Sequence, residues 1–350
     1  MIRIFNNFLR LLFIARTLAR HDALFFLDNF ERLPFYVVLL RKIMPVFALG
    51  ATRSKDLRDG ERLANALREL GPSFIKLGQA LSVRADLIGE EMVLDLGNLR
   101  DRLPPFPFEK ARETVEYELE APLEELFADF NPEPVAAASI AQVHFATVRE
   151  TVPAPTEADP GATEEILREV AVKILRPGVE SAFESDLQLF FWLAELAERY
   201  QPHFRRLRLT KIVETMADSV ELEMDLRMEA SAASEMAENF ADDPEFDVPE
   251  IDWQRTARRV MTQSRIDGIS ISKKEELAAA GHDLKALGDN VIRVFLHQVL
   301  RDGFFHADMH HGNLFVTADG RLVAVDFGIM GRMSRETRLF MAEMLHAFLT

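Results

Sequence analysis

The stretch His306–Asn313 reads HADMHHGN, and Asp326-Phe327-Gly328 follows it after a predicted hairpin that turns at Asp319-Gly320. Phosphoryl transfer needs a carboxylate beside the attacking hydroxyl or water. It also needs an amide oxygen and a second carboxylate to hold metal on the phosphates. Asp308 would orient or deprotonate the acceptor, whereas Asn313 and Asp326 would bind Mg²⁺ through oxygen ligands. A lone Asp-Phe-Gly can be a simple turn, but two such motifs around one hairpin predict a metal-assisted phosphoryl-transfer site.

A lysine late in a predicted strand supplies the cation that such a site requires. Val170-Ala171-Val172-Lys173 is an apolar run, and burying an ammonium there is costly unless anions meet its charge. Phosphates and the helix carboxylate of Glu229 would be those anions, although the lysine could also reach solvent from the strand end. The order and spacing of the motifs match those of protein kinases. We therefore expect an α+β, protein-kinase-like fold with two lobes and a helical N-terminal extension, its C-terminal lobe cut short at residue 350.

Composition narrows the classes of partner and metal site. The chain has 350 residues, 48% of them apolar, and a formal net charge of -16. Binding to nucleic acid needs a basic face, so no nucleic-acid partner is expected. Cysteine is absent, so the chain forms no disulfide and any metal must bind oxygen or imidazole ligands. A cytosolic active site fits this composition best.

The first 47 residues differ in charge from the rest of the chain. They hold seven basic and three acidic residues, a balance of +4 that leaves -20 on the remainder. Charges interrupt the Phe- and Leu-rich sequence before it reaches the roughly 20 apolar residues of a membrane span. The pattern predicts an amphipathic arm that lies on an anionic membrane surface. The structural alternative is a helical arm packed on its own domain.

Apolar spacing and helix breakers divide the chain into predicted elements. Helices are expected over 56–103 with a break at Gly71-Pro72 and a cap at Ser73, then over 109–120, 177–200, 211–240, 273–281, 284–302 and from 334 onward. Strands are expected over 143–148, 170–175, 246–251, 258–262, 314–316 and 322–325, with a solvated acidic loop over 151–165 and another loop over 303–313. Four regions follow: a membrane-proximal arm (1–50), a helical extension (51–130), an N-terminal lobe (131–268) with an acidic loop insertion (150–168), and the start of a C-terminal lobe (269–350).

The expected helix over 211–240 carries acidic residues at a regular spacing. Glu221, Asp225 and Glu229 recur at every fourth residue and would lie along one face. Like charges at this spacing repel one another. Either the face is solvated, or cations such as Lys173, Lys76 or Mg²⁺ lie against it, and for Glu229 and Glu223 we favour the second interpretation.

Three further motifs extend the pattern toward the N-terminus. They are Lys76-Leu77-Gly78-Gln79 on a helix, Ala136-Ala137-Ala138-Ser139-Ile140-Ala141-Gln142 before a strand, and Glu223-Met224-Asp225. With the motifs above, and in this order over residues 73–331, they make the chain resemble the UbiB family of atypical kinase-like proteins.

The resemblance implies ATP and Mg²⁺ as cofactors and gives each motif residue a role. The implied catalytic residues are Asp308, Lys76 and Gln79, and the implied metal ligands are Asn313, Asp326 and Glu223. The implied ATP-binding residues are Val135, Ala136, Ala137, Ala138, Ser139, Ile140, Ala141, Gln142, Val143, Lys173 and Glu229.

Several positions depart from the family's pattern. His311 stands where the family usually has proline, Met228 where it commonly has arginine, and Ser264 where it has a hinge glutamate. These changes affect adenine contacts and loop rigidity but remove no metal or phosphate ligand. Alanine also resists the positive φ that glycine adopts in ordinary kinase loops, so nucleotide geometry at 136–142 should differ.

The resemblance also implies a biological setting. The chain would be an ATPase or small-molecule kinase that supports ubiquinone biosynthesis at the cytoplasmic face of a bacterial inner membrane. The resemblance also implies C-terminal membrane helices beyond residue 350. Its helical extension would fold over the active site and hinder a peptide substrate. Membrane lipids, isoprenoid quinone precursors and ubiquinone-biosynthesis proteins would be its partners.

Three other functions stay open at this point. One is a phosphotransferase of the choline or aminoglycoside kinase type, and another is a non-catalytic nucleotide-gated scaffold. The third is a zinc or iron site formed by His306, Asp308, His310 and His311.

Overall fold

The structure is a computed structural model that describes residues 2–25, 57–82, 85–97, 99, 103–153, 163–200, 205–309 and 311–349. The chain forms two compact units. The first unit comprises Met1–Pro105, Ala137–Ala141 and Arg176–Glu221. The second comprises Phe106–Ala136, Gln142–Leu175 and Leu222–Thr350. The fold is mixed helix and sheet, as expected from the sequence.

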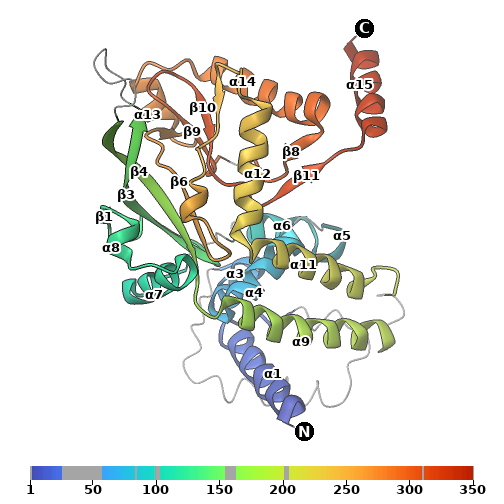
Figure 1. The fold of residues 1–350 in the computed structure, drawn as a ribbon. Helices are drawn as coiled ribbons and strands as arrows, with labels where there is room; N and C mark the ends of the chain where they lie inside the picture. The colour runs from blue at the N-terminus through green and yellow to red at the C-terminus, as the bar shows by residue number, and fades with distance from the viewer. Residues whose placement is uncertain are drawn as a thin grey trace, which may run out of the picture. The chain divides into compact units, whose positions relative to one another are not determined.

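The first unit is built from helices (Figure 1). They are α1 (Ile2–Arg20), α3 (Asp59–Leu70), α4 (Pro72–Ser82), α5 (Ala85–Ile88), α6 (Glu90–Gly97), α9 (Val179–Tyr200) and α11 (Leu209–Glu223), the last ending in the second unit. Gly71 separates α3 from α4 at a φ of 108°, a conformation that favours glycine, so the predicted break is confirmed. The predicted cap at Ser73 is wrong, because α4 already begins at Pro72, whose fixed φ suits a first helical position.

Helix α1 is held against its own unit by ion pairs. The Nε and Nη2 atoms of Arg10 each lie 2.9 Å from a carboxylate oxygen of Asp186 on α9, whose side chain is buried. Arg20 pairs with Glu69 on α3. The described part of the arm therefore packs on its own unit, in agreement with the structural alternative. Residues 26–56 lie outside the described part of the chain.

Most of the N-terminal sheet belongs to the second unit. Its strands are β1 (Asp129–Phe130), β2 (Ala136–Ala137), β3 (Ala141–Pro153), β4 (Thr163–Leu175) and β6 (Val260–Ser264), in the order β1-β3-β4-β6 with β2 beside β3. The antiparallel register of β4 and β6 places Lys173 opposite Met261. The loop predicted over 151–165 is too long, because β3 runs to Pro153 and β4 starts at Thr163. Residues 154–162 lie outside the description.

Side chains alternate between the two faces of this sheet, so its core and its chemistry lie on opposite sides. Val170, Val172 and Ile174 are fully buried in a core with α7 (Phe108–Leu119) and α8 (Leu123–Leu126). Lys173 points to the opposite face. That face meets α12 (Leu226–Asn239), which runs beside β6 in Figure 1.

The predicted helix over 211–240 is wrong, because two helices occupy it. Helix α11 ends at Glu223 and α12 starts at Leu226. Asp225 lies in an extended conformation between them and caps α12 by accepting from the Arg227 N–H. Glu221, Asp225 and Glu229 therefore do not lie along one helix face.

The C-terminal part of the second unit holds a small sheet and several helices. The sheet has the order β5-β10-β9-β7, and its strands are β5 (Phe246–Asp247), β10 (Leu322–Ala324), β9 (Leu314–Val316) and β7 (Ile269–Ser270). The helices are a 3₁₀ turn (Trp253–Arg255), α13 (Lys274–Ala279), α14 (Leu284–Leu296), a π-helix (His297–Asp302) and α15 (Arg335–Leu349). Gly320 has a φ of 88° between β9 and β10, which confirms the predicted hairpin.

Three details of this part were not expected. The predicted loop over 303–313 contains β8 (Phe304–His306), which pairs with β11 (Met330–Arg332). The predicted helix over 284–302 changes to π geometry at His297. The strand predicted over 246–251 is shortened to Phe246–Asp247. None of the helices in the described ranges is long and apolar enough to cross a membrane.

Candidate functional site

The structure brings Lys173, Glu229 and Asp326 together in the second unit. Lys173 Nζ lies 2.6 Å from Glu229 Oε1 and 3.5 Å from Asp326 Oδ2. Burial alone would lower the pKa of the lysine, but the two carboxylates outweigh burial and raise that pKa, so the ammonium stays charged. Glu229 is only 7% exposed. A strand lysine paired with a helix carboxylate is one of the contacts found in protein kinases.

Glu229 also binds the backbone of the metal loop. Its carboxylate accepts from the Phe327 N–H, next to Asp326. Burial raises the pKa of the Glu229 carboxyl, while Lys173 acts in the opposite direction. The break between α11 and α12 is what sets this position, because α12 starts just before Glu229 with its own cap. The cation that we expected against Glu229 is thus Lys173.

Asp326 keeps a carboxylate oriented for further contacts. Its Oδ1 accepts from the Gly328 N–H at 3.0 Å, and its side chain is 43% exposed. Burial would raise the pKa of this carboxyl, but Lys173 and the Gly328 N–H outweigh burial and lower the pKa. The group is therefore an anion at neutral pH that is still open to a ligand.

Backbone hydrogen bonds tie the catalytic loop to the metal loop. The Ala307 N–H donates to Ile329 at 3.0 Å, and the Val325 N–H donates to the carbonyl of Asn313 at 3.1 Å. Between these two ties, Asp308 is exposed and Asn313 is half-buried. The Asp308 N–H donates to His306 Nδ1 at 3.1 Å, and His306 is buried. The structure therefore joins the segments of Asp308, Asn313 and Asp326, as the motif spacing predicts.

Gln263 is a site residue that sequence reasoning missed. It lies opposite Ala171 in the sheet, on the face that also carries Lys173. Its Nε2 donates to the carbonyl of Val325 at 3.3 Å. Both backbone groups of Val325, the residue before Asp326, are thereby held. A polar residue late in a strand that precedes a turn was the available signal.

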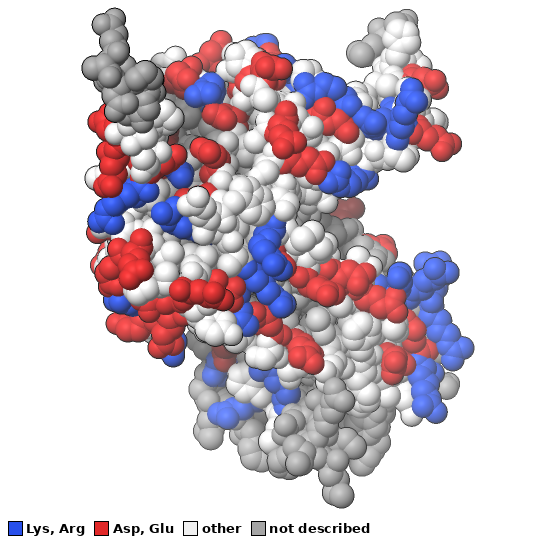
Figure 2. Space-filling view, in the orientation of Figure 1, with Lys and Arg blue, Asp and Glu red and all other residues white. Residues whose placement is uncertain are grey.

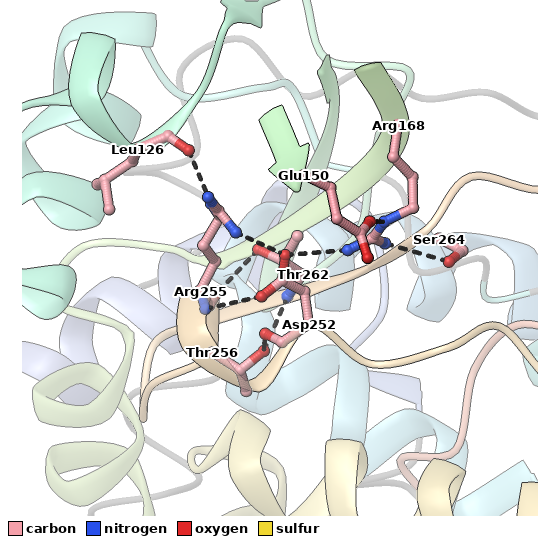
Figure 3. Close-up of polar contacts among 8 residues, drawn as sticks. All are labelled: Leu126, Glu150, Arg168, Asp252, Arg255, Thr256, Thr262 and Ser264. Carbon is pink, nitrogen blue, oxygen red and sulfur yellow. Dashed lines mark hydrogen bonds and ion pairs between the residues drawn. The ribbon is translucent and has the colours of Figure 1, made fainter. Parts of the chain in front are cut away.

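The opposite face of the sheet carries a charge network around one buried aspartate, which was also missed (Figure 3). Asp252 is buried and accepts from Arg255 Nη1 at 2.9 Å and Arg168 Nη2 at 3.2 Å. Arg168 also donates to Glu150 at 2.6 Å and to the hydroxyl of Ser264 at 3.3 Å. The network joins β3, β4 and β6. It thus fixes Ser264 from the side away from Lys173.

The alanine-rich segment is braced by Arg176. Both Nε and Nη2 of Arg176 donate to the carbonyl of Ala138, at 3.0 and 2.9 Å. Nη2 also donates to the carbonyl of Pro104 at 2.9 Å. No residue from 136 to 141 has a positive φ, which agrees with the conformational limit of alanine. Arg176 was missed because an arginine after a strand carries no motif of its own.

The residues around this segment differ in their access to a ligand. Val135 and Ala136 are exposed, Ala137, Ala138, Ile140 and Val143 are half-buried, and Ser139, Ala141 and Gln142 are buried. The hydroxyl of Ser139 has no hydrogen-bond partner among the described residues. Gln142 accepts from the Phe106 N–H at 3.0 Å and lies 2.8 Å from His144 Nε2. Any nucleotide contact of Gln142 would therefore use its backbone.

Lys76 and Gln79 lie on α4 in the first unit and are half-buried. Gly78 between them has a packing role, because a Cβ there would come within 2.8 Å of Leu67 and 2.9 Å of Leu99. Glu223 is half-buried at the end of α11. The catalytic roles of Lys76 and Gln79 and the metal role of Glu223 stay predictions.

The donor set around Asp326 suits a hard divalent cation. A carboxylate open to a ligand and the nearby segment of Asn313 offer the oxygen donors that Mg²⁺ prefers. Within the described ranges, no three or more His, Asp or Glu side chains gather closely enough to hold a metal ion by themselves. His310, which the zinc or iron hypothesis needs, lies outside those ranges. Magnesium held partly by nucleotide phosphates needs no such cluster.

Comparisons with known proteins agree with this geometry. The ABC1 atypical kinase-like domain matches residues 98–350. A probable protein kinase UbiB of Marinobacter nauticus is 42% identical over 296 residues, which cover 83% of this chain and 51% of the relative. A probable protein kinase UbiB of Pseudomonas paraeruginosa is 38% identical over 345 residues, covering 97% of this chain and 62% of the relative.

A solved structure also resembles the chain. It is a complex of the Mycobacterium tuberculosis protein Rv3197 with erythromycin, with a TM-score of 0.50 and 26% identity. The match covers 85% of this chain and 68% of that one. The chain spans 51% and 62% of the lengths of the two UbiB relatives. On its sequence match and its fold, it belongs to the ABC1 atypical kinase-like family.

Proposed function

We propose that the chain is the nucleotide-binding part of an atypical kinase or ATPase that uses ATP with Mg²⁺. The observation that carries this proposal is the 2.6 Å ion pair of Lys173 and Glu229, with Asp326 at 3.5 Å from the same ammonium. A lysine that touches two carboxylates has a surplus of negative charge around it. A divalent cation between Asp326 and bound phosphates would balance that surplus.

Each side chain then has a defined task. Lys173 contacts phosphate oxygens while Glu229 holds its ammonium in place. Asp326 and Asn313 hold Mg²⁺, which supplies neutralisation of phosphate charge when it is bound. The exposed Asp308 orients the acceptor hydroxyl or water.

The finer assignments belong to the same proposal. Residues 135–143 contact the nucleotide, Lys76 and Gln79 take part in catalysis, and Glu223 assists the metal. The four-region division of the chain, with arm, helical extension and two lobes, goes with them.

The biological setting is proposed from the relatives. Those reported are named probable protein kinase UbiB. We propose that the chain supports ubiquinone biosynthesis at the cytoplasmic face of a bacterial inner membrane. Its partners there are membrane lipids, isoprenoid quinone precursors and other proteins of that biosynthesis.

Calorimetry with ATP and Mg²⁺, together with ATP turnover, tests the nucleotide chemistry. Lys173→Met and Asp326→Asn should each reduce turnover by at least 100-fold, and Asp326→Asn should remove the Mg²⁺ dependence of ATP binding. Lys274→Met is a matched control, because Lys274 is exposed on α13. If Asp326→Asn keeps its affinity and its metal dependence, the metal assignment is wrong. Binding without any turnover in the parent protein would instead favour the scaffold.

A further inference from the structure

Positive charge gathers at one end of the α9–α11 helix pair, although the chain as a whole is acidic. Residues 199–211 hold five basic side chains and no acidic one. They are Arg199, Arg205, Arg206, Arg208 and Lys211, and we call them the α9–α11 tip. Figure 2 shows blue side chains clustered at the far end of these two helices.

Most of the basic side chains of the tip are available for an external partner. All five residues are exposed. Lys211 pairs with Glu214 at 2.9 Å, and Arg205 Nε donates to the carbonyl of Glu198 at 3.0 Å. Across the described ranges, no ion pair involves Arg199, Arg206 or Arg208. No carboxylate of the described residues neutralises these three arginines.

The backbone of the tip is strained where it presents one of these arginines. Arg208 has a φ of 49°, in the left-handed region that non-glycine residues rarely adopt. Its carbonyl accepts from the Ile212 N–H at 3.1 Å and so precedes the first turn of α11. Asparagine or glycine would suit this conformation better. Residues in this conformation cluster at active sites, ligand clamps and switch regions.

Apolar side chains are exposed on α9 next to the basic ones. Trp192 is 45% exposed, Leu193 38% and Tyr200 57%. Trp192 and Tyr200 are eight residues apart on the same helix, which places them on one face. Tryptophan and tyrosine favour the boundary between water and lipid, where the ring is apolar and its polar atom stays wet.

Two basic residues of helix α1 are less available for the same task. Arg10 and Arg20 on α1 are already paired with Asp186 and Glu69. These two charges are therefore compensated within the first unit.

We propose that the α9–α11 tip is the surface by which the first unit contacts an anionic lipid bilayer. The arginines meet lipid phosphates, and Trp192 and Tyr200 enter the headgroup region. A bilayer fits better than an acidic protein, because unpaired arginines and exposed aromatic rings lie side by side on one helix pair. An anionic bilayer offers phosphates for the first and an apolar boundary for the second. The inference rests on the membrane location in the proposed function, but it does not depend on nucleotide chemistry.

Vesicle binding by the full chain tests the electrostatic part. The probes are phosphatidylcholine vesicles with and without phosphatidylglycerol. The tip variant R199A/R205A/R206A should bind the anionic vesicles roughly 100-fold more weakly, given about 1 kcal/mol per basic residue near the surface. The control K110A/K274A/K285A removes three exposed lysines elsewhere and should bind like the parent. Equal binding by the tip variant and the parent would overturn the proposal.

Trp192 fluorescence tests the apolar part without changing the tip. The chain has two tryptophans, so Trp253→Phe leaves Trp192 as a single reporter. Its emission should shift to the blue on anionic vesicles. Salt screens the attraction between arginines and lipid phosphates but not the burial of an apolar ring, so part of this shift should remain at high salt. An unchanged spectrum at saturating vesicles would show that the tip does not enter the bilayer. ATP turnover measured without vesicles in the same variants separates this result from a failure of the proposed function.

Discussion

The Lys173–Glu229 pair permits a quantitative test of how the site is held together. Glu229→Gln keeps the volume of the side chain but removes its charge. Losing one partner of a buried pair costs about 3–5 kcal/mol, because the other charge stays buried and uncompensated. Lys173 keeps Asp326 at 3.5 Å, so we expect the lower end, about 3 kcal/mol lost from the free energy of unfolding.

Urea unfolding of four proteins measures this energy. They are the parent, Glu229→Gln, Lys173→Met and the double variant. The double variant should lose less than the sum of the single losses, with a coupling energy of about 2 kcal/mol. Glu113→Gln is a matched control, because its ion pair with Lys110 is also 2.6 Å long but exposed, and should cost about 0.5 kcal/mol or less. Additive losses would refute the idea that the two charges stabilise each other.

Three further results are expected. Gln263→Met removes the donor to the Val325 carbonyl, so half-saturation of turnover by Mg²⁺ should need roughly tenfold more metal while the fold is kept; an unchanged Mg²⁺ requirement would remove Gln263 from the site. Gly78→Ala should lower the free energy of unfolding by about 1–3 kcal/mol in thermal or urea unfolding, since a Cβ would press on Leu67; a stabilised variant would contradict the close approach of α4 and α3. Burial lowers the pKa of His144 from its ordinary 6.5, so its contribution to stability is present above that pH and is lost as pH falls. The free energy of unfolding should therefore be lower at pH 5 than at pH 7, and His144→Gln should reduce this difference.

The chemical motifs were predictable because their residues are close in sequence or carry a distinctive type. Lys173 stands in an apolar strand, and Asp308, Asn313 and Asp326 flank a hairpin marked by Asp319-Gly320. Short-range patterns of this kind survive folding, since the backbone ties between the two loops are local.

The misses have a different physical origin. The helix over 211–240 was read as continuous because its apolar spacing continues through Met224, which is buried, and nothing but the capping tendency of Asp225 marks the break. Strands β8 and β11 have three residues each, which is too short for an alternating pattern to show in the sequence. Arg176 and Gln263 act through backbone carbonyls, which leave no pattern in the sequence.

The bonds from Arg176 to Ala138 have a further consequence for the alanine-rich segment. The carbonyl of Ala138 and the N–H of Ser139 belong to one planar trans peptide unit, so they point in opposite directions. Because the guanidinium fixes the carbonyl, the Ser139 amide dipole is fixed too, with its positive end turned away from Arg176. Ser139 is fully buried, so this amide cannot turn unless the two hydrogen bonds from Arg176 to Ala138 break first. A glycine loop gains its close approach through freedom of motion, whereas here a side chain behind the loop sets the direction of the dipole in advance.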